Sequence, residues 1–132
     1  MRNENAEVHY VGKIDREIFC AIFSDIVTDE VIITDERIQH IRLRHPNDFE
    51  RYERYLREIV ENPDYIMGAN KPNSAILLKE FHEGSNQFQA ILRLHTSTDD
   101  PAYKNSIITF MRLNESRYKT YTRTKKVLYK RA

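Results

Sequence analysis

The spacing of the hydrophobic residues changes at Pro63, and this change constrains the fold more than any other feature of the chain. Before Pro63, apolar side chains recur at the spacing of one helix face, at Phe49, Tyr52, Leu56, Ile59 and Val60. Asn47 is a suitable cap for this helix, and Asn62 ends it because proline disfavours helical geometry in the preceding residue. The sequence therefore predicts one helix over residues 47–62.

After Pro63 the apolar residues occur in short or alternating runs that are typical of strands. These runs span residues 75–80, 88–94 and 106–113, with residues 65–67 as a candidate first member. Segments rich in Gly, Asn, Asp and Pro separate the runs and favour turns. We therefore expect an antiparallel meander in the second half of the chain.

The first half begins with shorter elements. Residues 8–14 and 18–22 are two candidate strands, although the second run equally suits the start of a helix. The β-branched residues 31–33 favour another strand, after which Thr34 can cap a helix over residues 35–44.

These elements predict the α+β class, in which an N-terminal helical part packs on a small antiparallel sheet of about four strands. A chain of 132 residues is long enough to bury one core without a disulfide or a metal ion. We expect a single domain over residues 1–132, with residues 1–7 as a poorly ordered N-terminus.

Charge is distributed unevenly, although the net charge is only +1. Residues 1–64 carry 15 Asp and Glu against 9 Lys and Arg, whereas residues 112–132 carry 8 Lys and Arg against a single Glu. The C-terminal cations, which include Arg123 and Lys126, alternate with tyrosines in a mixture that suits phosphates and stacked bases. A solvated segment that balances the acidic first half explains the same pattern, and both interpretations stay open, as does its conformation, helix or strand.

Two histidines, His40 and His45, accompany the predicted helix over residues 35–44. A separation of five residues rotates their side chains about 140° apart, so they are poorly placed to share one metal ion. On a helical wheel His45 falls in the apolar arc that should face the sheet, whereas His40 lies nearer the flank. A histidine at such a position is also explained by core packing or by capping of the helix C-terminus.

Polar residues also occur within the predicted strands. Lys79 and Arg93 each lie late in an otherwise apolar run, where a cation can also protect an edge or extend to solvent. Ser106 and Thr109 are an odd number of residues apart, so a regular strand points them to opposite faces. At most one of the two should face a given site unless a β-bulge intervenes.

Several classes of site have no signature in the sequence. Cys20 is the single cysteine, and its apolar neighbours predict a buried thiol. The five histidines match no zinc motif, no nucleophile elbow is present, and three glycines are too few for a phosphate loop. We expect neither a metal ion nor an organic cofactor. Because no long apolar stretch or signal peptide is evident, we expect no membrane association and a cytoplasmic location.

The remaining inventory of His, Lys, Arg, Ser and Thr suits RNA cleavage without a metal ion. In that reaction a base removes the proton of the 2′-OH, and an acid protonates the leaving 5′ oxygen. Fixed cations and hydrogen-bond donors stabilise the charged phosphorane between these steps.

Five sequence blocks also resemble a known family. They are ITDERIQHIRLRHP, ENPDYI, NKPN, NSIIT and VLYKR, which lie within residues 8–131. In this order they are similar to the phage-associated branch of the barnase, EndoU, colicin and RelE-like nucleases. The resemblance implies helices followed by a four-stranded antiparallel sheet, and a metal-independent endoribonuclease that serves as a toxin or phage-associated effector.

Catalytic residues are expected only in the blocks that match. The helical block contributes His45 as general base or acid, with His40 as its partner or as an orienting residue. The NSIIT block contributes Ser106 and Thr109, one of which would donate a hydrogen bond to the phosphate.

Substrate binding is expected to depend on cations. Lys71 comes from the NKPN block, whereas Lys79 and Arg93 are added from the strand pattern, and these three would hold the scissile phosphate. Arg123 and Lys126 would hold the flanking backbone.

The expected partners are RNA, with tRNA as one candidate, and a protein antidote or immunity partner. Two alternatives keep the fold without catalysis: a non-catalytic RNA-binding or protein-interaction module, and a structural protein whose oppositely charged segments pair. Salt-sensitive RNA retention without cleavage would distinguish the first alternative.

Overall fold

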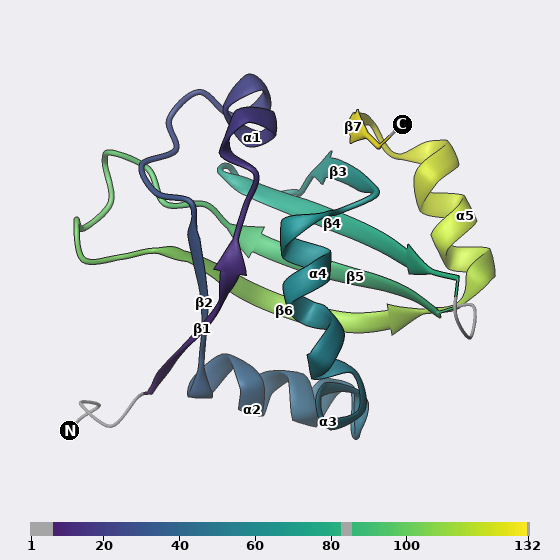
Figure 1. Cartoon of the computed structure of the whole chain (residues 1–132). Coiled ribbons are helices and arrows are strands. Elements are labelled where there is room, and N and C mark those ends of the chain that lie inside the picture. Colours follow the sequence, from purple (N-terminus) through teal and green to yellow (C-terminus); the bar gives the residue numbers. More distant parts are fainter. Residues whose placement is uncertain (1–6, 83–85, 132) are drawn as a thin grey trace.

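The computed structural model describes residues 7–82 and 86–131, which form a seven-stranded sheet flanked by helices (Figure 1). Within these residues the strand order is β1-β2-β6-β5-β4-β3-β7, and the β2–β6 pair is the only parallel one. The strands are β1 (Val8–Lys13), β2 (Glu30–Thr34), β3 (Tyr65–Gly68), β4 (Ser74–Phe81), β5 (Asn86–Arg93), β6 (Asn105–Leu113) and β7 (Val127–Lys130). The α+β class is as predicted, but the sheet has seven strands rather than about four.

The four strands β3 to β6 form the predicted antiparallel meander. The extra strands join through pairings between distant segments. β2 pairs with β6 only at Val31 with Asn105 and at Ile32 with Ser106, and β1 lies outside β2. β7 pairs with β3 at the opposite edge. The sequence predicts strands over residues 8–14 and 31–33 and leaves the conformation of the C-terminal segment open, but a pairing between distant segments leaves no local signal in the sequence. The predicted number of strands that join the sheet is therefore too low.

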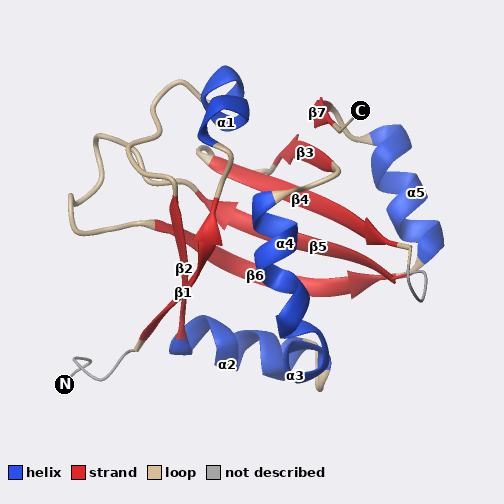
Figure 2. Ribbon diagram, in the orientation of Figure 1, coloured by secondary structure: helices blue, strands red, loops and turns tan. Residues whose placement is uncertain are grey.

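Helices cover both faces of the sheet, so they are not confined to the N-terminal part (Figure 2). The helices α1 (Arg16–Ile22), α2 (Asp35–Arg44), α3 (Asp48–Tyr52) and α4 (Leu56–Glu61) precede the meander and contribute to one core cluster. We call the side that they cover the helical face. α5 (Glu115–Thr124) follows β6 and packs on the other side, the α5 face.

The predicted helix after Thr34 is confirmed as α2. The Thr34 hydroxyl accepts a hydrogen bond of 3.2 Å from the backbone N–H of Arg37 and caps the helix. The run over residues 18–22 lies in helix α1 rather than in a strand. Because Phe19 fills the core from this helix, its neighbour Cys20 is exposed, and the predicted buried thiol is wrong.

The predicted single helix over residues 47–62 is wrong. A 3₁₀ turn, η2 (Glu53–Tyr55), separates α3 from α4. Residues three apart lie on the same side of a 3₁₀ turn, so Tyr52 and Tyr55 both pack against Phe88, with ring centroids 5.0 and 5.4 Å away. Aromatic packing therefore replaces the regular helical spacing at this point.

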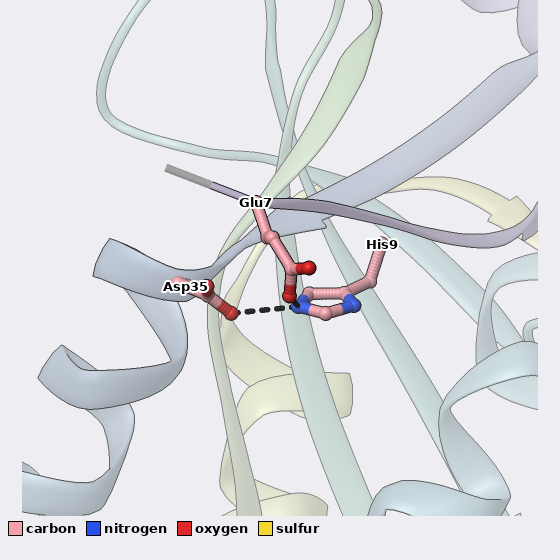
Figure 3. A group of neighbouring side chains, drawn as sticks. All are labelled: Glu7, His9 and Asp35. Atoms are coloured by element: carbon pink, nitrogen blue, oxygen red, sulfur yellow. Dashed lines mark hydrogen bonds and ion pairs between the residues drawn. The ribbon is translucent and has the colours of Figure 1, made fainter. Parts of the chain in front are cut away.

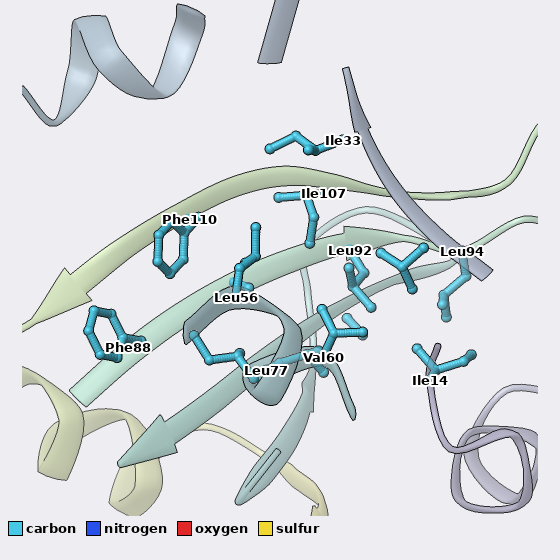
Figure 4. Packing of buried hydrophobic residues seen from close by; sticks show 14 of the residues in the cluster. Ile14, Ile33, Leu56, Val60, Leu77, Phe88, Leu92, Leu94, Ile107 and Phe110 are labelled. Atoms are coloured by element: carbon cyan, nitrogen blue, oxygen red, sulfur yellow. The ribbon is translucent and has the colours of Figure 1, made fainter. Parts of the chain in front are cut away.

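The helical face buries the larger hydrophobic cluster (Figure 4). Phe88 of β5 and Phe110 of β6 stack with their ring centroids 5.7 Å apart, and Leu56 and Val60 place α4 over the strands. Burial of each such side chain contributes about 1.5–3 kcal/mol. This layer fixes the strands that carry the candidate site on the opposite face.

The α5 face carries a smaller cluster beneath α5. Its buried members are Met67, Ile76, Leu78, Leu113 and Tyr118. Burial raises the pKa of the Tyr118 phenol. The cluster lies toward β3 and β4, whereas β2 and the start of β6 lie away from α5 (Figure 1). That second region holds the candidate site.

The C-terminal segment is a helix followed by a strand, so both conformations left open by the sequence occur. The threonines fit within α5 because their hydroxyls donate to backbone carbonyls, as Thr124 does to Thr120 at 2.7 Å. Residues 1–6 of the expected disordered N-terminus lie outside the described residues. Among residues 7–82 and 86–131, no helix has the length and apolar character needed to cross a membrane.

Candidate functional site

A pocket of about 490 Å³ opens on the α5 face beside β2 and β6. We call it the sheet-face pocket. The loop over residues 94–104 forms its outer wall. Its lining combines cations, hydroxyls and apolar side chains: Val8, Ile32, Thr34, Arg93, Leu94, His95, Asp99, Ala102, Tyr103, Lys104 and Ser106.

Strand register places Arg93 and Ser106 together at this pocket. The two residues are directly paired between β5 and β6, and Ile32 of β2 pairs with Ser106 from the other side. Directly paired residues point to the same side of a sheet. Because Val31 and Ile33 fill the core on the helical face, Ile32 and its partner must face the α5 side.

A β-bulge brings Thr109 to the same face as Ser106. Ile91 pairs with Thr109 and Leu92 with Ile107, so β6 contains one extra residue between these two pairs. Because of this extra residue, Thr109 points to the same face as Ser106, which regular alternation would not allow. From the sequence, at most one hydroxyl is expected on a given face unless a β-bulge intervenes, and the structure contains that bulge.

Arg93 is held in place by the loop over residues 94–104. Its guanidinium donates to the carbonyl of Leu94 and to Asp99 Oδ1, the latter at 3.0 Å. The backbone N–H of Thr96 lowers the pKa of Asp99, and Arg93 lowers it further. The Arg93 side chain remains 40% exposed, so a positive charge faces the pocket in a fixed orientation.

Asn105 joins the loop, β2 and β6 and is fully buried. Its Nδ2 donates to the carbonyls of Thr28 and Glu30 at 2.8 and 2.9 Å, and its Oδ1 accepts from the backbone N–H of His95 at 2.7 Å. The His95 ring in turn hydrogen bonds through Nε2 to the carbonyl of Asp100. His95 is 6% exposed and lines the pocket, and its Nδ1 has no hydrogen-bond partner among the described residues.

The mouth of the pocket carries an aromatic side chain and a second cation. Tyr103 is 61% exposed and meets the His95 ring edge to face, which leaves its outer face free to stack on a planar group. Lys104 Nζ lies 2.5 Å from Glu30 Oε1, and this contact lowers the pKa of Glu30. Cations, hydroxyls and an exposed ring together suit a phosphate with an attached base.

The two predicted histidines lie in the layer next to β6. α2 contacts β6 from the helical face, whereas Ser106 and Thr109 of that strand point to the α5 face. His45 follows as the C-cap of α2, where its backbone N–H donates to the carbonyl of Ile41. Both histidines are partly exposed. Among the described residues, no hydrogen bond or ion pair joins either imidazole to the sheet-face pocket.

Lys79 is not part of the sheet-face pocket. It pairs with Phe88 across β4 and β5, so it faces the helical side, opposite to Arg93. Only 7% of its side chain is exposed, and its Nζ lies 3.4 Å from Asp64 and 4.0 Å from Glu58. These two carboxylates therefore neutralise the charge of Lys79 within the fold.

The other predicted cations lie on the surface. Lys71 is exposed in the turn between β3 and β4, and the carbonyl of Asn73 in that turn accepts from the N–H of Leu94 beside the pocket. Arg123 and Lys126 are exposed at the end of α5 and just beyond it, outside the pocket lining. Lys71 thus lies in a turn that is hydrogen-bonded to a residue of the pocket lining.

Sequence reasoning missed the loop residues of the site. Asp99, Tyr103, Lys104 and Asn105 lie in or directly after a stretch that reads only as a turn. The alternation of apolar residues in the neighbouring strands does not indicate a shared pocket. These loop residues come close to β2 because β2 pairs in parallel with β6.

A comparison with protein-family models matches residues 6–130 to the family described as phage-Barnase-EndoU-ColicinE5/D-RelE like nuclease 2. The chain belongs to this family. The predicted relationship to the phage-associated nucleases is thereby confirmed over nearly the whole chain. Membership in this nuclease-like family supports a nuclease function in general and a nucleic acid as substrate. Searches of curated proteins and of solved structures returned no significant match.

Proposed function

We propose that this protein is a metal-independent endoribonuclease whose sheet-face pocket binds the scissile phosphate. The observation that carries the proposal is the pairing of Arg93 with Ser106, with Thr109 brought to the same face by the bulge. Arg93 and Ser106 both line the pocket, whereas Thr109 shares their face without being part of the lining. A partly exposed guanidinium beside a hydroxyl provides both the charge and a hydrogen-bond donor that a phosphate needs.

The proposed reaction is an internal transesterification. A base takes the proton of the 2′-OH, the 2′ oxygen forms a bond to phosphorus, and the bond from phosphorus to the 5′ oxygen breaks. An acid then gives a proton to the departing 5′ oxygen, leaving a 2′,3′-cyclic phosphate and a 5′-OH. Arg93 would stabilise the negative charge that accumulates on the phosphorane, and Ser106 or Thr109 would hydrogen bond to it.

Acid and base are assigned to His45 and His40. The assignment comes from the sequence, because imidazole exchanges protons near neutral pH. α2 packs on the helical face, and the structure does not bring either ring to the sheet-face pocket. Asp99 is a poorer base because its pKa is lowered, and it serves to orient Arg93. Two ionising histidines would give a bell-shaped dependence of cleavage rate on pH.

The substrate would extend beyond the pocket. Lys71 lies in the turn next to Leu94 and can approach one side of the bound strand. Arg123 and Lys126 are exposed cations that would bind more distant phosphates, a contribution that weakens as salt rises. A toxin or phage-associated role, controlled by an antidote protein, is part of the same proposal.

The test incubates purified protein with total RNA or tRNA in EDTA, beside His45→Ala and a control variant, His82→Ala. His82 is an exposed histidine outside the sheet-face pocket. Cleavage by the wild type and by His82→Ala that is lost in His45→Ala would support the proposal. An inert wild type that retains RNA in a salt-sensitive manner would instead favour a binding module.

A further inference from the structure

Three potential metal ligands converge where β1 approaches the start of α2 (Figure 3). His9 Nε2 lies 2.6 Å from Asp35 Oδ1 and 3.9 Å from Glu7 Oε1. One ligand atom of each residue lies within 4.8 Å of the other two. None of the three lines the sheet-face pocket.

Backbone pairing holds these residues together. The backbone N–H of Asp35 donates to the carbonyl of Glu7 at 3.0 Å, directly beyond the antiparallel pair of Val8 with Thr34. His9 pairs with Ile33 one step further along β1 and β2. Asp35 is also the first residue of α2, so its position is fixed by the helix. The three donors are therefore presented by neighbouring segments that the backbone hydrogen bonds join.

The three donor groups converge on one point. Both carboxylates approach the same imidazole nitrogen, Nε2, rather than one approaching each nitrogen (Figure 3). One imidazole and two carboxylates form a donor set that Zn²⁺ accepts, with water as a fourth ligand. A cleft of about 410 Å³ adjoins the cluster and is lined by His9 and Asp35 together with Arg42 and Phe49, which leaves room for that water.

We propose that Glu7, His9 and Asp35 bind one Zn²⁺ ion that ties β1 to the start of α2. A small adjustment of the His9 and Asp35 side chains would open their 2.6 Å contact to the spacing of two zinc ligands. The site is separate from the proposed cleavage step, which uses no metal ion. Sequence motifs gave no sign of it because His9 and Asp35 are 26 residues apart.

The experiment titrates the metal-free full chain with Co²⁺, whose visible absorption reports tetrahedral coordination, and repeats the titration with Zn²⁺ as competitor. Wild type should bind one equivalent, and Zn²⁺ should displace it. His9→Ala should abolish the signal, and Glu7→Gln should weaken binding about tenfold or more. The Glu7 side chain is 73% exposed, so its substitution leaves the folded chain intact.

Two control variants match these changes in chemistry. His82→Ala removes an exposed histidine elsewhere, and Glu36→Gln removes a carboxylate from the first turn of α2 outside the cluster. Both should bind Co²⁺ as the wild type does. Zn²⁺ should also raise the melting temperature of the wild type but not that of His9→Ala.

A wild type that binds no Co²⁺, or a His9→Ala variant that binds it equally well, would overturn the proposed zinc site. The result is independent of the proposed ribonuclease function, because RNA cleavage is measured in EDTA and metal binding without RNA. A failure of one proposal is therefore distinguishable from a failure of the other.

Discussion

Lys79 and Arg93 lie on neighbouring strands and look alike in the sequence, yet the structure gives them opposite surroundings. Lys79 faces the helical layer, where two carboxylates surround its ammonium and 7% of its side chain is exposed. Arg93 faces the α5 side, where it meets one carboxylate and lines a pocket with 40% of its side chain exposed. The charge of Lys79 is neutralised within the fold, whereas the guanidinium of Arg93 is available to a ligand.

The difference follows from strand register rather than from residue type. In β4, Lys79 pairs with Phe88, whose ring lies in the core of the helical face. In β5, Arg93 pairs with Ser74 on one side and Ser106 on the other, and these side chains are directed to the α5 face. The comparison predicts that Lys79 controls stability and Arg93 controls activity.

The largest expected effect is that of Arg93→Ala on RNA cleavage. Loss of a group that stabilises transition-state charge should lower kcat/KM about 100- to 1000-fold. Stability should fall by about 1 kcal/mol or less, because the Arg93–Asp99 pair is partly exposed. Arg112→Ala, which removes an exposed arginine of β6 outside the sheet-face pocket, is the matched control and should retain activity. Equal losses of cleavage activity in Arg93→Ala and Arg112→Ala would contradict the role in activity that the comparison gives to Arg93.

Asn105→Ala should cost about 3 kcal/mol in the free energy of unfolding, because buried polar groups lose their partners. Its side chain makes three hydrogen bonds that fix the loop over residues 94–104 against β2. Urea denaturation measures the change, and cleavage should fall with it because the loop positions Arg93. An unchanged midpoint would contradict the role given to Asn105.

Lys79→Met should lower stability by about 2 kcal/mol, since it leaves Asp64 and Glu58 without their shared cation. The estimate is below the usual value for a fully buried pair because both carboxylates are partly exposed. Urea denaturation and RNA cleavage, measured where the variant is folded, separate the two effects. A specific loss of cleavage with normal stability would place Lys79 in the site after all.

The smallest expected effect concerns the dependence of stability on pH. The pKa of Asp99 is lowered from its ordinary value of 3.8, so its ionised form stabilises the folded state at neutral pH. This contribution should disappear as pH falls below 3.8 and through the folded-state pKa. The difference in melting temperature between wild type and Asp99→Asn should therefore shrink in acid. A difference that is constant with pH would contradict the Arg93–Asp99 arrangement.

Local signals in the sequence predicted the elements that depend on neighbouring residues. The cap at Thr34 and the helix that follows are correct, and so is the antiparallel meander from Tyr65 to Leu113. The single helix over residues 47–62 failed because Tyr52 and Tyr55 both pack on a strand that follows later in the chain. Tertiary packing determines the helix geometry there.

The site could be predicted only in part for a related reason. Arg93, Ser106 and Thr109 were selected from the sequence, but their common face depends on a bulge that residue types do not reveal. Lys79 was grouped with them because alternation within a strand gives no register between strands. The loop residues Asp99, Tyr103 and Lys104 line a pocket that the parallel pairing of β2 with β6 helps to form, and a pairing between such distant segments leaves no local signal in the sequence.

The most direct measurement of the central claim is the chemistry of the RNA ends. Purified protein in EDTA is incubated with an RNA oligonucleotide and with a matched DNA oligonucleotide, and the products are identified by mass spectrometry. Our account predicts that the RNA is cut into one fragment that ends in a 2′,3′-cyclic phosphate and one that begins with a 5′-OH, and that the DNA is not cut. Arg93→Ala should form far less of both RNA fragments. Cleavage of DNA, or cleavage of RNA only after a divalent metal ion is added, would contradict it.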